Sequence, residues 1–293
     1  LGEQDKGVES KEAFLALVNK FPKSRFQPVS WARIGEFYFD NNELDNAIAA
    51  YLKVLDFPDS VFYDKALYKL GWTYYRQDSY ELAVRTFFKL MDYYADKENK
   101  EGKKGAGGEL KVEAVQYSAV SFAEDAWGGI DKTRQLIASY DRALPYERDV
   151  WVALGNIYFD TTRFPESIQC YKKAIELDGA HADNPEMQAK IIQSFERLRD
   201  FDNATKAREF LVANYSEGST WYEANKFNYD ILRKAAELTE KSLLSAAIFH
   251  HQQAQAMKKA GKTEEAVNEY LLGAEGYETY LKKYPFTKQK YEL

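Results

Sequence analysis

The residues best able to do chemistry are three histidines, His181, His250 and His251, and one cysteine, Cys170. Neighbouring residues on a helix point about 100° apart, so His250 and His251 do not form the paired ligands of a zinc-binding H-E-x-x-H motif. A single cysteine excludes an intrachain disulfide and a Cys-rich zinc site. We therefore predict no metal site and interpret Cys170 as a small core side chain.

A glycine-rich stretch at residues 102–108 is the feature that comes nearest to a nucleotide-binding motif. A phosphate-binding loop requires G-x4-G-K-[ST] after a strand, whereas Gly107 is followed by Gly108 and Glu109. The chain also lacks the G-x-S-x-G turn of a nucleophilic serine. We predict no cofactor and no catalytic residue. An enzyme whose acid, base and nucleophile converge from distant segments stays an open alternative.

The composition, with 45% apolar and 29% charged residues, is typical of a folded helical protein. A net charge of -6 argues against a general nucleic-acid-binding surface, which needs a basic field. No run of apolar residues approaches the roughly 18 that a membrane span needs. The chain begins at Leu1 without a methionine or a signal-like stretch. We expect a trimmed or processed chain, and membrane association through an upstream anchor stays open.

Helices must position the histidines and Cys170, because the clearest pattern in the chain is helical. Residues 148–181 carry the signature W-x2-L-G-x2-Y, followed by two residues at the places of A-x3-F: Trp151, Leu154, Gly155, Tyr158, Ser167 and Tyr171. The segment resembles the tetratricopeptide repeat (TPR), a unit of about 34 residues that folds as two antiparallel helices. Gly155 and Ser167 are small because the two helices cross there. One unit cannot cover its own apolar face, so we expect repeats on both sides.

Two further segments, 28–61 and 64–97, carry the same pattern around Gly35 and Gly71. The exits Phe-Pro-x-Ser at Phe21 and Phe57 are similar to the repeats of outer-membrane assembly lipoproteins and of the periplasmic partner of the Tol-Pal system. That resemblance implies a periplasmic or outer-membrane-associated protein of a bacterial envelope assembly or motility complex. A cytoplasmic location is the alternative.

The sequence therefore predicts an all-α, right-handed TPR solenoid in three parts. Residues 1–97 hold a partial repeat and two full repeats, and residues 98–109 are predicted to be a flexible loop because they are rich in glycine and charge. Residues 110–293 hold degenerate repeats, with an additional helix near 221–241 and a last helix pair at 244–259 and 263–283.

The resemblance also implies a concave groove, lined at fixed positions by the first helix of each unit. Transferred to this chain, those positions hold Ala32, Glu36, Phe39, Asp40, Lys65, Tyr68, Trp72, Tyr75, Arg76, Val152, Asn156, Phe159 and Asp160. Tyr68, Trp72 and Tyr75 form an aromatic strip with the cation Arg76 beside it, and such a strip can anchor a peptide. The alternative is that these aromatics pack on neighbouring helices. Replacing Trp72 by alanine is predicted to weaken partner binding more than stability.

The acidic groove residues suggest a peptide with basic as well as apolar positions. The carboxylate clamp of chaperone-binding repeats is not supported, because Ala32 and Glu36 stand where its lysine and asparagine would be. We predict a scaffold without catalytic activity that binds a protein or peptide partner. The alternative is binding of peptidoglycan or another envelope glycan through exposed aromatics. The sequence does not set the oligomeric state.

Overall fold

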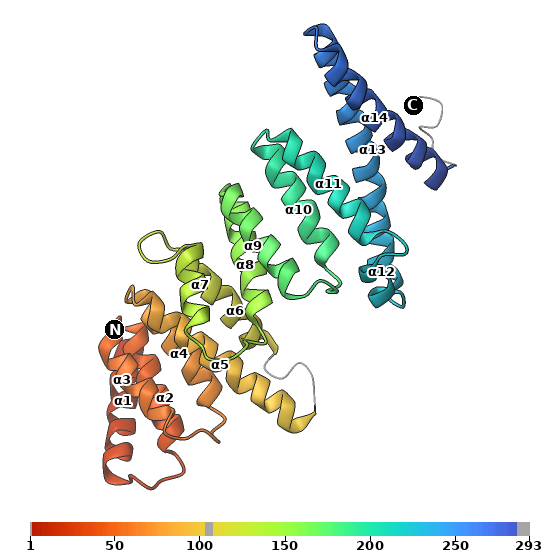
Figure 1. Cartoon of the computed structure of the whole chain (residues 1–293). Coiled ribbons are helices and arrows are strands. Elements are labelled where there is room, and N and C mark those ends of the chain that lie inside the picture. The colour runs from red at the N-terminus through yellow and green to blue at the C-terminus, as the bar shows by residue number, and fades with distance from the viewer. Residues whose placement is uncertain (1, 103–107, 286–293) are drawn as a thin grey trace. The chain divides into compact units, whose positions relative to one another are not determined.

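The computed structural model describes residues 2–102 and 108–285, and every regular element within them is an α-helix (Figure 1). The helices, in chain order, are α1 (Gly2–Lys20), α2 (Gln27–Asp40), α3 (Leu44–Val54), α4 (Tyr63–Arg76), α5 (Tyr80–Glu101), α6 (Gly108–Ala123), α7 (Ile130–Ala138), α8 (Glu147–Asp160), α9 (Phe164–Leu177), α10 (Asn184–Arg197), α11 (Phe201–Tyr215), α12 (Thr220–Asn225), α13 (Tyr229–Lys259) and α14 (Thr263–Lys283). The predicted all-α class is confirmed. No helix of the described part is both long and apolar enough to cross a membrane.

Five of the helix pairs are joined by one recurring turn, in which a single residue adopts positive φ. The residues at this place are Asn42, Asp78, Thr162, Arg199 and Gly261. The next N–H then donates to a carbonyl at the end of the first helix, for example from Glu43 to Tyr38 at 2.8 Å and from Ser79 to Tyr74 at 2.9 Å. This is the Schellman arrangement, which ends a helix while satisfying its last carbonyls.

The crossing of the two helices in a pair depends on glycine, as the sequence pattern predicts. A Cβ atom on Gly35 would lie 2.6 Å from Cε1 of Tyr51, and one on Gly71 would lie 2.6 Å from Cε1 of Phe87. Both rings are fully buried. The aromatic ring of the second helix therefore occupies the space that a side chain on the first helix would need.

The predicted loop at residues 98–109 is wrong at both ends. Helix α5 continues to Glu101, and α6 begins at Gly108. The segment DKENKE before Gly102 contains good helix formers and no glycine or proline, and α5 stops only where Gly102 takes φ of 63°. Lys111 on α6 pairs with Glu98 on α5 at 3.0 Å, which a loop would not hold in place. Residues 103–107 lie outside the described part.

The predicted helices at 221–241 and 244–259 are also corrected. A short helix, α12, is followed by one continuous helix, α13, which spans the expected break. No glycine or proline interrupts Tyr229–Lys259. The helix starts instead at a cap, where the side chain of Asn228 accepts a hydrogen bond from the N–H of Ile231.

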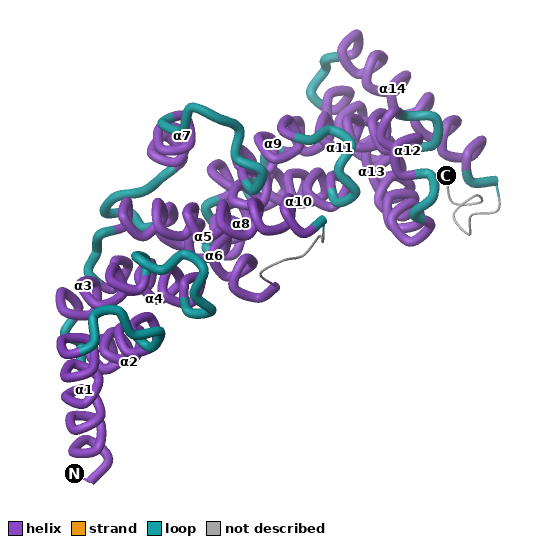
Figure 2. Tube along the Cα trace, turned by 90° about the horizontal axis from the view of Figure 1, so that it is seen from below, coloured by secondary structure: helices purple, strands orange, loops and turns teal. Residues whose placement is uncertain are grey.

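The chain divides into two compact units, Leu1–Ile157 and Tyr158–Leu293. This boundary lies inside α8 and differs from the predicted division at residue 97. The core of the first unit is rich in aromatic residues, including Phe87, Phe88 and Tyr94, all fully buried. In the second unit, α13 and α14 lie side by side through small residues, so that a Cβ atom on Gly276 would lie 2.8 Å from Cβ of Ala247 (Figure 2).

Candidate functional site

The first unit has a cavity of about 410 Å³ on the face formed by its first helices α2, α4 and α6. We call it the α2–α4 cavity. Its lining comes mainly from α2 and α4, with one residue each from α3, the turn before α4 and α6: Ala32, Arg33, Glu36, Tyr51, Phe62, Lys65, Ala66, Tyr68, Lys69 and Leu110. Four predicted groove positions, at Ala32, Glu36, Lys65 and Tyr68, thus lie around one cavity.

The hydroxyl of Tyr51 is the unusual polar group of this cavity. The side chain is 1% exposed, and its hydroxyl oxygen has no hydrogen-bond partner among residues 2–102 and 108–285. Burial raises the pKa of Tyr51, and the charges of Glu36 and Asp40 raise it further. The hydroxyl therefore keeps its proton at neutral pH. It remains a donor without an acceptor, a state that costs about 1–3 kcal/mol in a folded protein.

The charges around the cavity are mostly positive. Arg33 holds the carboxylate of Glu36 at 2.6 Å. Two lysines lie over aromatic rings of the same face, Lys65 over Phe62 at 5.9 Å and Lys69 over Phe39 at 5.2 Å. The lining has three cations and one carboxylate, so the predicted preference for basic peptide positions does not follow from it. Arg33 and Lys69 are not among the predicted groove positions, which follow the repeat pattern. Their spacing from Glu36 and Lys65 nevertheless puts them on the same helix faces.

The aromatic strip of α4 is partly covered by α6. The ring centroid of Trp72 lies 4.1 Å from that of Tyr117 and 5.7 Å from that of Tyr75, and Trp72 is half-buried. The hydroxyl of Tyr75 donates to Glu124 at 2.6 Å. Trp72 thus packs against α6, and Tyr75 is bonded to the residue that follows α6, which is the packing alternative left open above. We now expect replacement of Trp72 to lower stability as well as binding.

Tyr68 is the member of the strip that lines the cavity. Burial and a hydrogen bond to Glu113 on α6 raise its pKa to about 12. Glu113 and Tyr117 are not among the predicted groove residues, because α6 carries only a degenerate repeat pattern. Their spacing nevertheless places both on one face of a helix.

Arg76 and Phe39 form a structural contact between α4 and α2. The guanidinium of Arg76 lies 4.5 Å from the ring centroid of Phe39 and donates to the Phe39 carbonyl at 3.1 Å. It also donates to the side chain of Asn42 at 2.8 Å. A cation that satisfies the C-terminal end of a helix is stabilising, so Arg76 has a role without a ligand. Asp40, one residue after Phe39, is exposed.

The predicted groove residues of α8 do not join this cavity. Val152 and Asn156 are half-buried residues of the first unit. Phe159 and Asp160 belong to the second unit, where Phe159 lies 5.7 Å from the ring of Phe164 and Asp160 is exposed. Among the described residues, the predicted groove positions that line this cavity lie on α2 and α4.

The histidines and Cys170 have ordinary surroundings. His250 lies between Glu269, 2.7 Å from its Nδ1, and Glu209, 3.2 Å from its Nε2. His251 Nδ1 lies 3.3 Å from the Tyr277 hydroxyl. Across the described residues, no group of three or more His, Cys, Asp or Glu side chains is placed to hold a metal ion. Cys170 is fully buried, as its interpretation as a core residue requires.

Family models of the tetratricopeptide repeat match residues 28–58, 65–97 and 148–181. The chain is a TPR protein. The matched segments are the three repeats predicted most clearly from sequence, and the predicted TPR solenoid class is confirmed. The models describe the repeat in general, so the narrower resemblance to envelope lipoproteins stays a prediction.

Similar solved structures include YrrB, a TPR protein with an unusual peptide-binding site, at 14% identity over 78% of this chain and 99% of that chain, with a TM-score of 0.33. The apo quorum sensor NprR from B. thuringiensis is 14% identical over 94% of this chain and 84% of its own, with a TM-score of 0.34. MamA is 17% identical over 85% of this chain and 97% of its own, with a TM-score of 0.25. A comparison with curated proteins gave no significant match.

Proposed function

We propose that this TPR protein is a scaffold without catalytic activity that binds an extended segment of a partner protein in the α2–α4 cavity. The observation that carries the proposal is Tyr51, a residue of the cavity lining whose buried hydroxyl has no acceptor among residues 2–102 and 108–285. Repeat arrays use the face of their stacked helices as a binding surface. A peptide carbonyl or side-chain oxygen supplies the acceptor that the free protein lacks, and this offsets the cost of the unpaired hydroxyl.

The rest of the cavity suits the mixed chemistry of a peptide. Ala32, Ala66 and Leu110 give it an apolar part, against which a partner side chain can be buried. Lys65 and Lys69 provide charged donors near the same space. Glycan binding, in contrast, requires an aromatic face open to solvent. Trp72, the candidate for that role, is half-buried with Tyr117 close against it, so no observation favours the glycan alternative.

The cellular setting is a further part of the proposal. The Phe-Pro-x-Ser exits at Phe21 and Phe57 support a periplasmic or outer-membrane-associated protein within a bacterial envelope assembly or motility complex. Fractionation of cells that produce the full-length protein tests this setting. We expect the protein in the periplasmic or outer-membrane fraction, and recovery in the cytoplasm would contradict this part of the proposal.

The binding site is tested with peptides selected against the wild-type chain from a random library. Replacing Tyr51 by phenylalanine keeps the ring beside Gly35 and removes only the hydroxyl. We expect the variant to be as stable as the wild type or more stable, because the hydroxyl is unpaired in the free protein. We expect its affinity for a selected peptide to fall about tenfold, the equivalent of one lost hydrogen bond. Calorimetric titration and thermal unfolding measure the two effects.

Tyr171 offers the matched control, because it occupies the equivalent place in the repeat at residues 148–181. Burial raises the pKa of Tyr171, and a side-chain hydrogen bond with Ser167 lowers it. Tyr171→Phe should lower stability by about 1 kcal/mol and leave the affinity for the peptide unchanged. Equal affinity of the wild type and Tyr51→Phe for every selected peptide would place the binding site elsewhere.

A further inference from the structure

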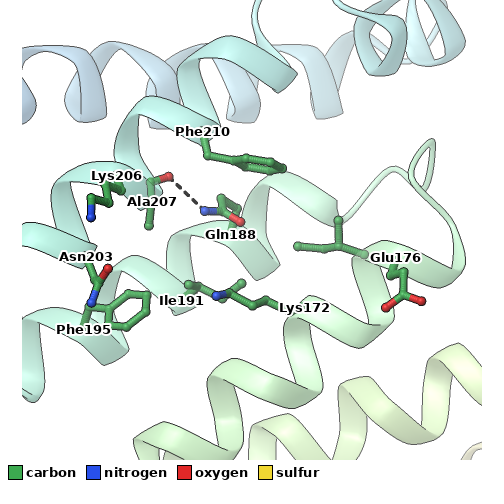
Figure 3. A pocket seen from close by; sticks show the side chains of 10 residues that line it. Lys172, Glu176, Gln188, Ile191, Phe195, Asn203, Lys206, Ala207 and Phe210 are labelled. Atoms are coloured by element: carbon green, nitrogen blue, oxygen red, sulfur yellow. Dashed lines mark hydrogen bonds between the residues drawn. The ribbon is translucent and has the colours of Figure 1, made fainter.

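The second unit has its own cavity, of about 520 Å³, on α9, α10 and α11 (Figure 3). None of the predicted groove residues lines it. The lining is Lys172, Ile175, Glu176, Gln188, Ile191, Phe195, Asn203, Lys206, Ala207 and Phe210. We call it the α9–α11 groove. Its two sides are second helices of their pairs, and α10 lies between them.

The groove presents an apolar surface that is partly open. Ile191 and Ala207 are 1% and 7% exposed, and Ile175 and Phe195 are half-buried. Phe210, which projects over the cavity in Figure 3, is 46% exposed. When a partner covers an aromatic side chain that is this exposed, its apolar surface leaves water and binding is stabilised.

Gln188 adds a hydrogen-bond acceptor to the groove. The side chain is 5% exposed, and its Nε2 donates to the carbonyl of Ala207 at 2.9 Å (Figure 3). Because a carbonyl only accepts, this bond fixes which end of the amide is nitrogen. The Gln188 Oε1 accepts no hydrogen bond from the residues that the structure describes. A ligand in the groove can therefore donate an N–H to it.

The charge at one end of the groove is positive. The ammonium of Lys172 lies 5.8 Å from the ring centroid of Phe195, and Lys206 on α11 lines the same side of the groove (Figure 3). The carboxylate of Glu176, toward the other end, pairs with Lys173 at 2.9 Å. A carboxylate on the ligand is thus attracted to the end formed by Lys172 and Lys206.

The groove is longer than its main cavity. A neighbouring cavity of about 360 Å³ shares Ile175 and Phe210 with it and continues along α11 to Tyr215 and Trp221. A continuous surface of this kind suits a length of polypeptide better than a compact small molecule. The free acceptor at Gln188 agrees with this, because every residue of an extended peptide except proline offers an N–H.

We propose that the α9–α11 groove docks a short extended segment of a partner protein that carries two large apolar side chains and an acidic residue. The apolar side chains lie against Ile191 and Phe210, and a backbone N–H of the segment donates to Gln188. The carboxylate lies near Lys172 and Lys206. This site belongs to a different unit from the α2–α4 cavity, and it does not depend on the function proposed for that cavity.

The test uses peptides selected from a random library on the wild-type chain, each then titrated against single variants. Phe210→Asp places a charge at the centre of the groove, and a class of selected peptides should lose affinity at least about tenfold. Phe201→Asp is the matched control, because Phe201 lies on the same helix, is 49% exposed and does not line the groove. The same peptides should bind Phe201→Asp and Tyr51→Phe as they bind the wild type.

The charge assignment is tested by replacing Lys172 and Lys206 together with glutamine, and by replacing the acidic residue of the peptide with its amide. Each change should weaken binding several-fold, and the two together should weaken it little more than either one alone.

The docking site is overturned if no selected peptide is affected by Phe210→Asp, or if Phe201→Asp weakens binding equally. Peptides of this class that lack acidic residues would overturn the charge assignment. If every selected peptide loses affinity only in Tyr51→Phe, this site is refuted and the α2–α4 cavity is supported. A peptide that loses affinity only in Phe210→Asp supports this site and does not bear on the function proposed for the α2–α4 cavity.

Discussion

Replacing Trp151 by alanine should lower the free energy of unfolding by about 3–5 kcal/mol, the range for truncating a buried aromatic side chain. The Trp151 side chain is 1% exposed, and its indole Nε1 donates to Glu147 at 3.2 Å. The substitution removes a large apolar volume and leaves a cavity that the helices fill only in part. Urea denaturation followed by circular dichroism measures the change, and the slope of the transition shows whether unfolding stays cooperative.

Trp127 provides the comparison for this prediction. It is half-buried and stacks on Phe122 with ring centroids 5.7 Å apart, so its replacement by alanine should cost clearly less. If Trp151→Ala loses under about 1 kcal/mol, Trp151 does not fill the core of its repeat, since values near that size are typical of surface or half-buried positions.

The second large effect is expected for Gly71→Ala. The new methyl group would lie between 2.6 and 2.9 Å from three ring atoms of Phe87, a residue with no exposed surface. The ring has no open space to move into, so α4 and α5 must separate. Overpacking of this kind costs about 1–3 kcal/mol, and thermal unfolding of the variant measures it.

Gly179→Ala is the matched control for the crossing. A Cβ atom at Gly179 meets no atom within 4 Å, so this variant should be neutral or slightly stabilised. Combining Gly71→Ala with Phe87→Leu replaces the ring by a smaller side chain, and this should recover part of the lost stability. Equal stability of Gly71→Ala and Gly179→Ala would show that the crossing does not require glycine.

The repeat pairs could be predicted from sequence because their physics is local. Gly35 and Gly71 mark the helix crossings, and the aromatic residue on each second helix fills the space opposite. The turn residues Asn42 and Asp78 then end the first helix by a short-range bond pattern. Each of these features depends on a few neighbouring residues, so a single repeat signature specifies the pair.

The candidate sites were less predictable because they depend on contacts between repeats. Tyr117 covers Trp72 only through the packing of α6 on α4, and α6 carries no clear signature. Whether the Tyr51 hydroxyl finds an acceptor depends on the residues packed around it, and this cannot be predicted from the presence of a tyrosine in the sequence. The α9–α11 groove was missed for another reason, since the repeat pattern directs attention to first helices. The long helix α13 spans the break predicted between residues 241 and 244, because no glycine or proline interrupts Tyr229–Lys259.

The central claim, that a partner segment occupies the α2–α4 cavity, is tested most directly by photo-crosslinking. A selected peptide whose affinity depends on the Tyr51 hydroxyl is prepared with a benzophenone side chain, irradiated with the wild-type protein and mapped by mass spectrometry. We predict crosslinks to Ala32–Glu36 on α2 and to Lys65–Lys69 on α4. Crosslinks confined to α5, or to the second unit, would contradict the claim.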